Sequence, residues 1–239
     1  MVMQNPECGL DYVVIVAGGS GRRMGSDVPK QFLEIEGKPI LMHTIERFRA
    51  ALPEAGLVLV LPQEQMAYWD RLCRASTFAV SHTVVKGGAT RFHSVLNGLN
   101  ALPEEEKHAV VAIHDGVRPF VASEVIRHAF QLAHEGKNVV PVLSVVESLR
   151  RIDGETGLSH AVNRQEYYAV QTPQVFPLEV LRRAYRQTYH EGFTDDASVV
   201  EQDGGLISLI PGNRENIKIT TPFDLAISRE ILFGKGDLT

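Results

Sequence analysis

The chain has 239 residues, of which 44% are hydrophobic and 22% charged, and this composition predicts a globular protein with one substantial core. A formal net charge of −5 argues against a nucleic-acid binder, because such proteins depend on an excess of Lys and Arg. Cys8 and Cys73 form no C-x-x-C pair, the N-terminus lacks a signal-peptide pattern, and no segment reaches the roughly 18 apolar residues of a membrane span. We therefore expect a cytoplasmic protein with a small-molecule partner, no nucleic acid and no membrane.

Short apolar runs alternate with amphipathic segments up to residue 142. The apolar runs predict strands at 12–17, 57–61, 83–85, 109–114 and 138–142. The segments between them repeat apolar residues at helical spacing and predict helices at 40–52, 63–75, 91–102 and 123–135. This alternation indicates an α/β fold with a mostly parallel sheet and helices on both faces. Ligands bind such sheets at the carboxyl ends of the strands.

The pattern changes at residues 145–170. Two runs of mixed polarity flank the turn residues Asp153-Gly154 and Thr156-Gly157, which is typical of a long hairpin. Because a two-stranded ribbon alone is marginally stable in water, we expect this arm to protrude and to pack on a second copy of the chain in a homodimer. The remaining sequence predicts helical segments at 178–190 and 195–203, strands at 206–210 and 216–220, and a closing helix.

The first expected strand runs into a glycine-rich turn in the sequence VVIVAGGSGRRMGSDVPKQ. Gly18, Gly19 and Gly21 let backbone N–H groups converge on an anion, while Arg23 and Lys30 add fixed positive charge. This pattern favours a polyphosphate ligand. The alternative is a plain strand-turn that only requires positive φ angles.

The turn differs from two common phosphate-binding loops. It lacks the Lys and Ser or Thr that follow the last glycine of G-x-x-x-x-G-K-[ST]. Met24 stands at the third glycine position of G-x-G-x-x-G, and Pro29 interrupts any helix that begins at Ser20. The sequence therefore argues against both a P-loop and a dinucleotide fold.

Three further groups of residues bear on chemistry. In KGGATRFHSV, Arg91 and Ser94 fall on one face of a first helical turn, which indicates either an anion or base pocket or a capped glycine turn. Asp115 ends a buried strand, where a carboxylate facing phosphates is a typical Mg²⁺ ligand and a salt bridge to Arg118 is the alternative. Lys218, in NIKIT, is either a cation facing a cleft or an edge lysine whose charged end reaches water.

Nothing in the sequence indicates a general base. The chain contains neither a G-x-S-x-G elbow nor H-E-x-x-H, and we expect His114 to be a packed strand residue. A phosphate monoester is already ionised at neutral pH. Its attack on a second phosphate therefore requires cations and N–H dipoles where charge accumulates, and no proton abstraction.

Six ordered motifs cover nearly the whole chain: AGGSGRRM with PKQ, GGATRFHSV, HDGVRP, NRQEYYAVQTPQVF, TDDAS and NIKITTPFDL. In these motifs the chain resembles the sugar-phosphate cytidylyltransferase family, and within it the enzymes that act on 2-C-methyl-D-erythritol 4-phosphate. The resemblance implies a single Rossmann-like nucleotidyltransferase domain over residues 1–239, with 145–170 as a dimerisation arm. It also implies Mg²⁺-dependent transfer of CMP from CTP to that sugar-alcohol phosphate in non-mevalonate isoprenoid biosynthesis. The products would be 4-diphosphocytidyl-2-C-methyl-D-erythritol and pyrophosphate.

The resemblance further implies a role for individual residues in each substrate site. The nucleotide would contact Ala17, Gly18, Gly19, Gly21, Gly88, Ala89, Ser94 and Asp115, with Asp115 also holding Mg²⁺ and with Arg23, Lys30 and Lys218 as catalytic cations. The second substrate would contact Arg118, Thr172, Thr194 and Lys218 of one subunit and Ser148 and Arg164 of the other subunit's arm. Ser148 is assigned with a two-residue shift, because PVLSVVESLRR is longer than the family pattern P-V-x-D-T-x-K.

Two other functions stay open. Enzymes that make CDP-ribitol from ribitol 5-phosphate share AGG-x-G-x-RMG, PKQF, QTPQ and NIKITTP with this chain, although the segment from ESLRR to VNRQEYY is more similar to the methylerythritol enzymes. The second alternative is a non-catalytic nucleotide-binding regulator on the same fold. Such a regulator would bind CTP, and this binding would not require Lys30 or Asp115.

Overall fold

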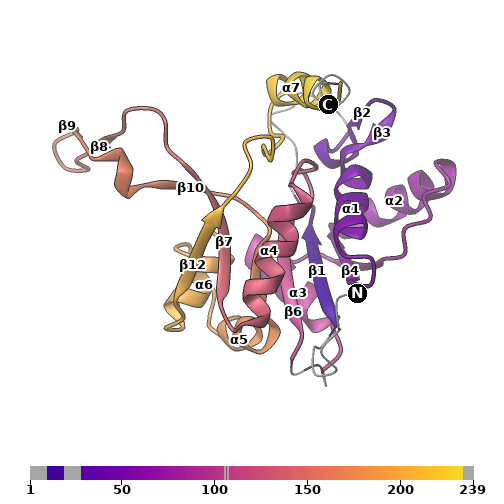
Figure 1. Cartoon of the computed structure of the whole chain (residues 1–239). Helices are drawn as coiled ribbons and strands as arrows, with labels where there is room; N and C mark the ends of the chain where they lie inside the picture. The colour runs from indigo at the N-terminus through magenta and orange to yellow at the C-terminus, as the bar shows by residue number, and fades with distance from the viewer. Residues whose placement is uncertain (1–9, 19–27, 105, 107, 234–239) are drawn as a thin grey trace.

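The computed structural model describes residues 10–18, 28–104, 106 and 108–233, and an eight-stranded mixed sheet forms its centre (Figure 1). The strand order is β10-β7-β11-β6-β1-β4-β5, and β12 also pairs with β7. The strands are β1 (Asp11–Val16), β4 (Gly56–Leu61), β5 (Thr83–Lys86), β6 (Val110–Asp115), β7 (Asn138–Ser144), β10 (Tyr168–Val170), β11 (Gln174–Pro177) and β12 (Ile207–Pro211).

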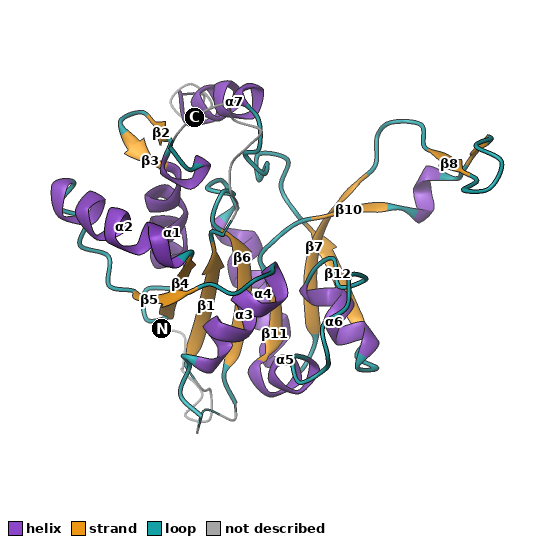
Figure 2. Cartoon of the chain, turned by 180° about the vertical axis from the view of Figure 1, so that it is seen from behind, coloured by secondary structure: helices purple, strands orange, loops and turns teal. Residues whose placement is uncertain are grey.

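Helices cover both faces of this sheet, as the alternating pattern predicts. On one face α1 (Ile40–Ala51), α2 (Gln63–Ala75) and α4 (Ser123–His134) pack against Val13 and Ile15 of β1. On the other face α3 (Arg91–Asn100), α5 (Leu178–Ala184) and α6 (Asp196–Gln202) pack against Val14 and Val16 (Figure 2). Successive side chains of β1 thus point into two different apolar clusters, which explains why the strand reads as a continuous apolar run.

The sheet is less regular than the sequence predicts. Strands β5, β4, β1 and β6 pair in parallel, and β12 is parallel to β7. Between β6 and β7, however, β11 runs antiparallel to both, and β10 is also antiparallel to β7. The prediction of a mostly parallel sheet is confirmed, but the sequence pattern predicts no strand at β11.

The expected arm projects from the sheet, although its hairpin is shorter than predicted (Figure 1). Strands β8 (Arg150–Ile152) and β9 (Ser159–Ala161) pair antiparallel, and the Asp153 N–H donates to the Leu158 carbonyl across the turn. Gly157 has a φ of 69°, a left-handed conformation that favours glycine. The last expected arm residues, β10, instead join the main sheet beside β7.

Two other predictions about elements are wrong. The segment 216–220 is not a strand: Ile219 is buried and its N–H donates to the Val117 carbonyl, but no ladder forms among the described residues. The helix predicted at 178–190 ends at Ala184. The remaining elements are η2 (Lys30–Phe32), β2 (Glu34–Ile35), β3 (Lys38–Pro39), η3 (Arg164–Glu166) and α7 (Pro222–Phe233).

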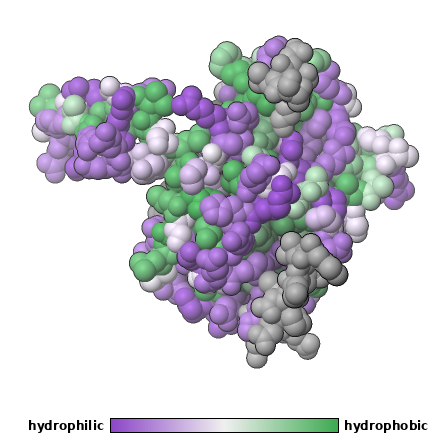
Figure 3. Space-filling model, viewed as in Figure 1, coloured by the Kyte–Doolittle hydropathy of each residue, from purple (hydrophilic) through white to green (hydrophobic). Residues whose placement is uncertain are grey.

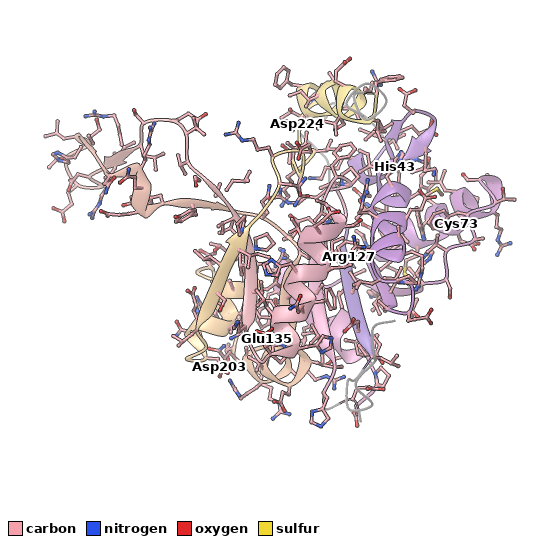
Figure 4. All side chains as sticks on the ribbon, viewed as in Figure 1. His43, Cys73, Arg127, Glu135, Asp203 and Asp224 are labelled. Atoms are coloured by element: carbon pink, nitrogen blue, oxygen red, sulfur yellow. The ribbon has the colours of Figure 1, made fainter. Side chains whose placement is uncertain are left out.

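Helix α7 is fixed to the segment before it by Asp224, labelled in Figure 4. The Asp224 Oδ2 atom accepts the backbone N–H groups of Thr220 and Thr221, each at 2.8 Å. Lys218 lies two residues before Thr220, so these hydrogen bonds to Asp224 also help to position the segment that carries Lys218. Within the described part of the chain, no helix is long and apolar enough to cross a membrane.

Candidate active site

A cavity of about 580 Å³ opens at the carboxyl ends of β1, β4, β5 and β6. This is the edge where the topology of a parallel sheet favours ligand binding. Its lining includes Ala17, Gly18, Lys30, Gly88, Ala89, Ser94, Asp115 and Lys218, and also Arg91 and Glu64. The structure therefore brings together eight residues that the sequence assigned to the nucleotide and to catalysis.

Asp115, the last residue of β6, is surrounded by three cations. Its Oδ2 atom lies 2.9 Å from Lys218 Nζ and 3.4 Å from Arg118 Nε, while its Oδ1 atom lies 3.8 Å from Arg91 Nε. Burial alone would raise the pKa of Asp115, but the charges of Arg91, Lys218 and Arg118 outweigh it and hold the pKa well below its ordinary value. The carboxylate is therefore ionised at neutral pH.

Arg118 and Thr172 contact Asp115 but are not among the residues that line the cavity. The Asp115 N–H donates to Thr172 Oγ1 at 3.1 Å, and Arg118 Nη1 donates to the Asn216 carbonyl at 2.8 Å. Asn216 is itself fully buried and donates through Nδ2 to the Thr172 carbonyl. These contacts tie the end of β6 to the segment that carries Lys218.

Arg91, the first residue of α3, is held by a partner that the sequence did not reveal. Its Nη1 and Nη2 atoms donate to the two carboxylate oxygens of Asp196, at 2.9 and 2.6 Å. Tyr185 donates its hydroxyl to Asp196 Oδ1 at 2.6 Å. Arg91 and Asp196 are 105 residues apart in the sequence, so no local spacing pattern could have indicated this pair.

The turn after β5 is shaped for close backbone approach. The Gly88 N–H donates to Ser94 Oγ at 3.1 Å, and the Ser94 hydroxyl donates to the Thr90 carbonyl at 2.9 Å. A Cβ atom at Gly88 would lie 2.4 Å from His93 Cβ, so only glycine fits there. Thr90 caps α3 by accepting the His93 N–H.

The PKQ motif contributes both a cavity residue and an anchor. Lys30 and Gln31 both line the cavity, and the buried Gln31 side chain donates through Nε2 to the Ala17 carbonyl and to Gln65 Oε1. Phe32 then stacks on Trp69 of α2, with ring centroids 6.1 Å apart. These contacts hold η2 against the segment that follows β1. The predictions for Gly19, Gly21 and Arg23 lie outside the described residues.

Three further expected substrate residues, besides Arg118 and Thr172, do not line the cavity. Ser148 and Arg164 are exposed on the arm, where Arg164 Nη1 donates to the Val146 carbonyl. Thr194 is exposed immediately before Asp195, the N-cap residue of α6. Within one chain, then, Ser148, Arg164 and Thr194 are separate from the cluster around Asp115.

His114 is fully buried, which confirms that it is a packed strand residue. Its ring packs against Phe48 with centroids 4.7 Å apart, and Nε2 lies 3.0 Å from the Arg118 carbonyl oxygen. Burial lowers the pKa of His114 from 6.5 to about 4. Between these values the unfolded chain binds a proton at this residue and the folded chain does not, so stability falls as the pH falls through this window.

We expect the lowered pKa of His114 to reduce the free energy of unfolding by about 2 kcal/mol when the pH is lowered from 7 to 5. Urea unfolding at the two pH values measures the loss. A His114→Gln variant should lose less stability than the wild type over the same interval, since its side chain does not titrate. Equal losses in both proteins would contradict the prediction.

A family model described as IspD, 2-C-methyl-D-erythritol 4-phosphate cytidylyltransferase, matches residues 12–233. The chain belongs to this family. The resemblance drawn from the six motifs is thereby confirmed, and with it the expectation of a nucleotidyltransferase enzyme with a Rossmann-like α/β fold.

Individual relatives agree with the family match. The 2-C-methyl-D-erythritol 4-phosphate cytidylyltransferase of Bacteroides thetaiotaomicron is 54% identical over 220 residues, covering 92% of this chain and 98% of the relative. The structure of the enzyme of that name from Thermus thermophilus has a TM-score of 0.73 at 29% identity and covers 92% of this chain and 97% of its own. A 4-diphosphocytidyl-2C-methyl-D-erythritol synthase from Anaerococcus prevotii, at 24% identity, supports the fold alone with a TM-score of 0.81, covering 96% of this chain and all of its own.

Proposed function

We infer that the chain transfers CMP from CTP to 2-C-methyl-D-erythritol 4-phosphate. An oxygen of the acceptor phosphate forms a bond to the α-phosphorus of CTP, and the bond between the α-phosphorus and the bridging oxygen of the β-phosphate breaks, releasing pyrophosphate. The observation that carries this proposal is the family match over residues 12–233, joined to a cavity lined by Lys30, Arg91 and Lys218. The match favours this activity over ribitol 5-phosphate transfer and over a non-catalytic regulator.

The cations of the cavity account for the main electrostatic requirement of this reaction. Two anionic phosphates must approach each other, so positive side chains and backbone N–H groups lower the barrier where charge accumulates. In the proposed roles Lys30 and Arg23 stabilise the reacting α-phosphate, and Lys218 orients the acceptor phosphate beside Asp115. Gly18, Gly19 and Gly21 bind the triphosphate through their backbone, and Gly88, Ala89 and Ser94 bind the cytidine.

Asp115 fits the binding of a divalent cation. Mg²⁺ in nucleotide sites takes one or two carboxylates, phosphate oxygens and water, so a single aspartate suffices. Among the described residues no group of three or more His, Cys, Asp or Glu side chains could hold a metal by itself. We assign the remaining ligands to phosphate oxygens of the nucleotide and to water. Asp115 Oδ1 makes the longer contact of 3.8 Å to Arg91 and is the oxygen we assign to Mg²⁺. The bound ion would neutralise phosphate charge.

We assign the arm to a homodimer. Its base borders a groove of about 1040 Å³ lined by β7, β10 and β12, and exposed apolar residues gather there (Figure 3). Tyr168, Val170 and Leu209 are each about half exposed in the single chain, a pattern that a partner subunit would bury. In this dimer Arg118, Thr172 and Thr194 stay on the acceptor side of the site, and the partner subunit's Ser148 and Arg164 complete it. The cytoplasmic location remains a prediction.

An Arg164→Ala variant should raise the KM for the acceptor by about 10-fold or more and leave the KM for CTP unchanged. Removing one charged hydrogen-bond partner of a phosphate costs about 1.5 to 3 kcal/mol, and in the proposed dimer this guanidinium contacts the acceptor and not the nucleotide. Steady-state kinetics with each substrate varied in turn measures the split. Arg151→Ala, on the same exposed arm, is the matched control. An unchanged acceptor KM in Arg164→Ala would exclude the arm from the site.

The activity itself is tested by pyrophosphate release with CTP, Mg²⁺ and each candidate acceptor. Turnover with 2-C-methyl-D-erythritol 4-phosphate that exceeds turnover with ribitol 5-phosphate supports the proposal. A preference for ribitol 5-phosphate would assign the chain to CDP-ribitol synthesis. CTP binding without turnover of either acceptor would indicate a nucleotide-binding regulator.

A further inference from the structure

Asp196 is a buried carboxylate whose side-chain contacts converge on one residue of the active site. Both of its oxygens accept hydrogen bonds from the two terminal nitrogens of Arg91, Nη1 and Nη2, which we call the fork of Arg91. Tyr185 adds a hydrogen bond to Oδ1. The Asp196 side chain is fully buried and Tyr185 is nearly so. A bidentate pair in such surroundings fixes the plane and the direction of the guanidinium.

This arrangement leaves Arg91 close to Asp115 without a hydrogen bond between them. The third guanidinium nitrogen, Nε, lies 3.8 Å from Asp115 Oδ1, beyond the usual hydrogen-bond range of about 2.7 to 3.2 Å. The other oxygen, Oδ2, is already contacted by Lys218 and Arg118. If Asp196 no longer held the fork of Arg91, the neighbouring Asp115 carboxylate would be the best hydrogen-bond acceptor for it. The guanidinium would then cover Asp115 Oδ1.

We propose that Asp196 is a positioning residue that holds the fork of Arg91 away from Asp115 and so keeps Asp115 Oδ1 open to the divalent cation. The inference rests on the proposed function, which assigns the cation to that oxygen. Replacing a residue that hydrogen-bonds to a metal ligand and orients it commonly changes metal affinity by about 10- to 100-fold. Asp196 acts one step further out, through Arg91.

The proposal predicts a loss of metal affinity in an Asp196→Asn variant of the full chain. Mn²⁺ is titrated in the presence of saturating CTP, and the ternary complex is followed by water-proton relaxation, which requires no turnover. The Mn²⁺ dissociation constant should rise about 10- to 100-fold. Asp70→Asn is the matched control, because Asp70 forms a similar two-contact pair with Arg74 on the exposed surface of α2.

A double-mutant cycle separates this mechanism from a simple change of charge. In an Arg91→Gln background there is no fork to hold, so adding Asp196→Asn should change Mn²⁺ affinity by less than about threefold. If the loss of the Asp196 charge acts through the electric field alone, its effect will be the same in both backgrounds. That result would overturn the proposal.

A second variant keeps the test decisive if Asp196→Asn does not fold. Asp196→Glu retains the buried charge pair but lengthens the side chain that holds the guanidinium by one methylene. Because this displaces the guanidinium beside Asp115, Mn²⁺ binding should weaken at least about threefold. Unchanged Mn²⁺ affinity in this folded variant would overturn the proposal. Failure of the underlying assignment gives a different result: an Asp115→Asn variant would then bind Mn²⁺ with CTP as tightly as the wild type.

Discussion

Replacing Lys30 with alanine is expected to lower kcat by about 10²- to 10³-fold. This is the range found when one preorganised contact to a developing charge is removed from an active site. Lys30 lines the cavity, and Gln31 anchors the short η2 helix on which it lies. Because negative charge accumulates at the α-phosphate mainly in the transition state, kcat should fall more than the KM for CTP rises. Pyrophosphate release at saturating CTP and acceptor measures the effect.

Lys137→Ala is the control for this loss of a lysine. Lys137 pairs with Glu135 beyond the end of α4, where Figure 4 labels Glu135, and neither residue lines the cavity. Its replacement should leave kcat within about twofold of the wild type, as for most surface substitutions. A Lys30→Ala enzyme that is as fast as this control would remove Lys30 from the mechanism. The same experiment on Arg23 tests the second proposed catalytic cation.

An Asp115→Asn variant should lose at least about 100-fold in Mg²⁺-dependent turnover. The substitution removes the carboxylate assigned to the metal, whose stabilisation of phosphate charge is worth several kcal/mol. It also leaves Arg91, Arg118 and Lys218 without the anion that they share. The cavity then becomes more positive, so CTP should bind at least as tightly as to the wild type when EDTA removes all metal.

The two opposite effects distinguish a lost metal ligand from a damaged fold. Calorimetric titration of CTP with and without Mg²⁺ reports them separately. Asp203→Asn provides the control, since Asp203 (Figure 4) pairs with Arg183 at the surface and is not among the cavity residues. Weakened CTP binding in EDTA would indicate that Asp115 maintains the shape of the site, and an unchanged Mg²⁺ requirement would end its assignment to the metal.

The parallel half of the fold could be predicted because each of its elements carries a local signal. Strands buried on both faces read as apolar runs, and the helices between them repeat apolar residues at helical spacing. The antiparallel β11 carries no such signal, because its four residues QVFP directly follow a polar motif and precede a helix. At 216–220 the pattern left two interpretations of Lys218 open, and in the structure Lys218 lines the cavity while Ile219 is buried. It could not reveal that no neighbouring strand pairs with this segment in the described part of the chain.

Most of the charged residues at the site could be predicted, whereas the partner that orients Arg91 could not. Glycine turns and strand-end charges are visible in the sequence, and they indicated Gly18, Lys30 and Asp115. The pairing of Arg91 with Asp196 depends on α6, which packs on α5, lying beside the first turn of α3. Contacts of this kind are set by tertiary packing, and a single sequence carries no record of them.

The packing of Phe32 on Trp69 has a practical consequence. The chain contains a single tryptophan, and its indole ring lies against the residue two positions after Lys30. The protein therefore carries its single tryptophan close to the cavity that we assign to the nucleotide. Its emission comes from a single, defined environment, so an optical titration of this cavity requires neither a dye nor an introduced label.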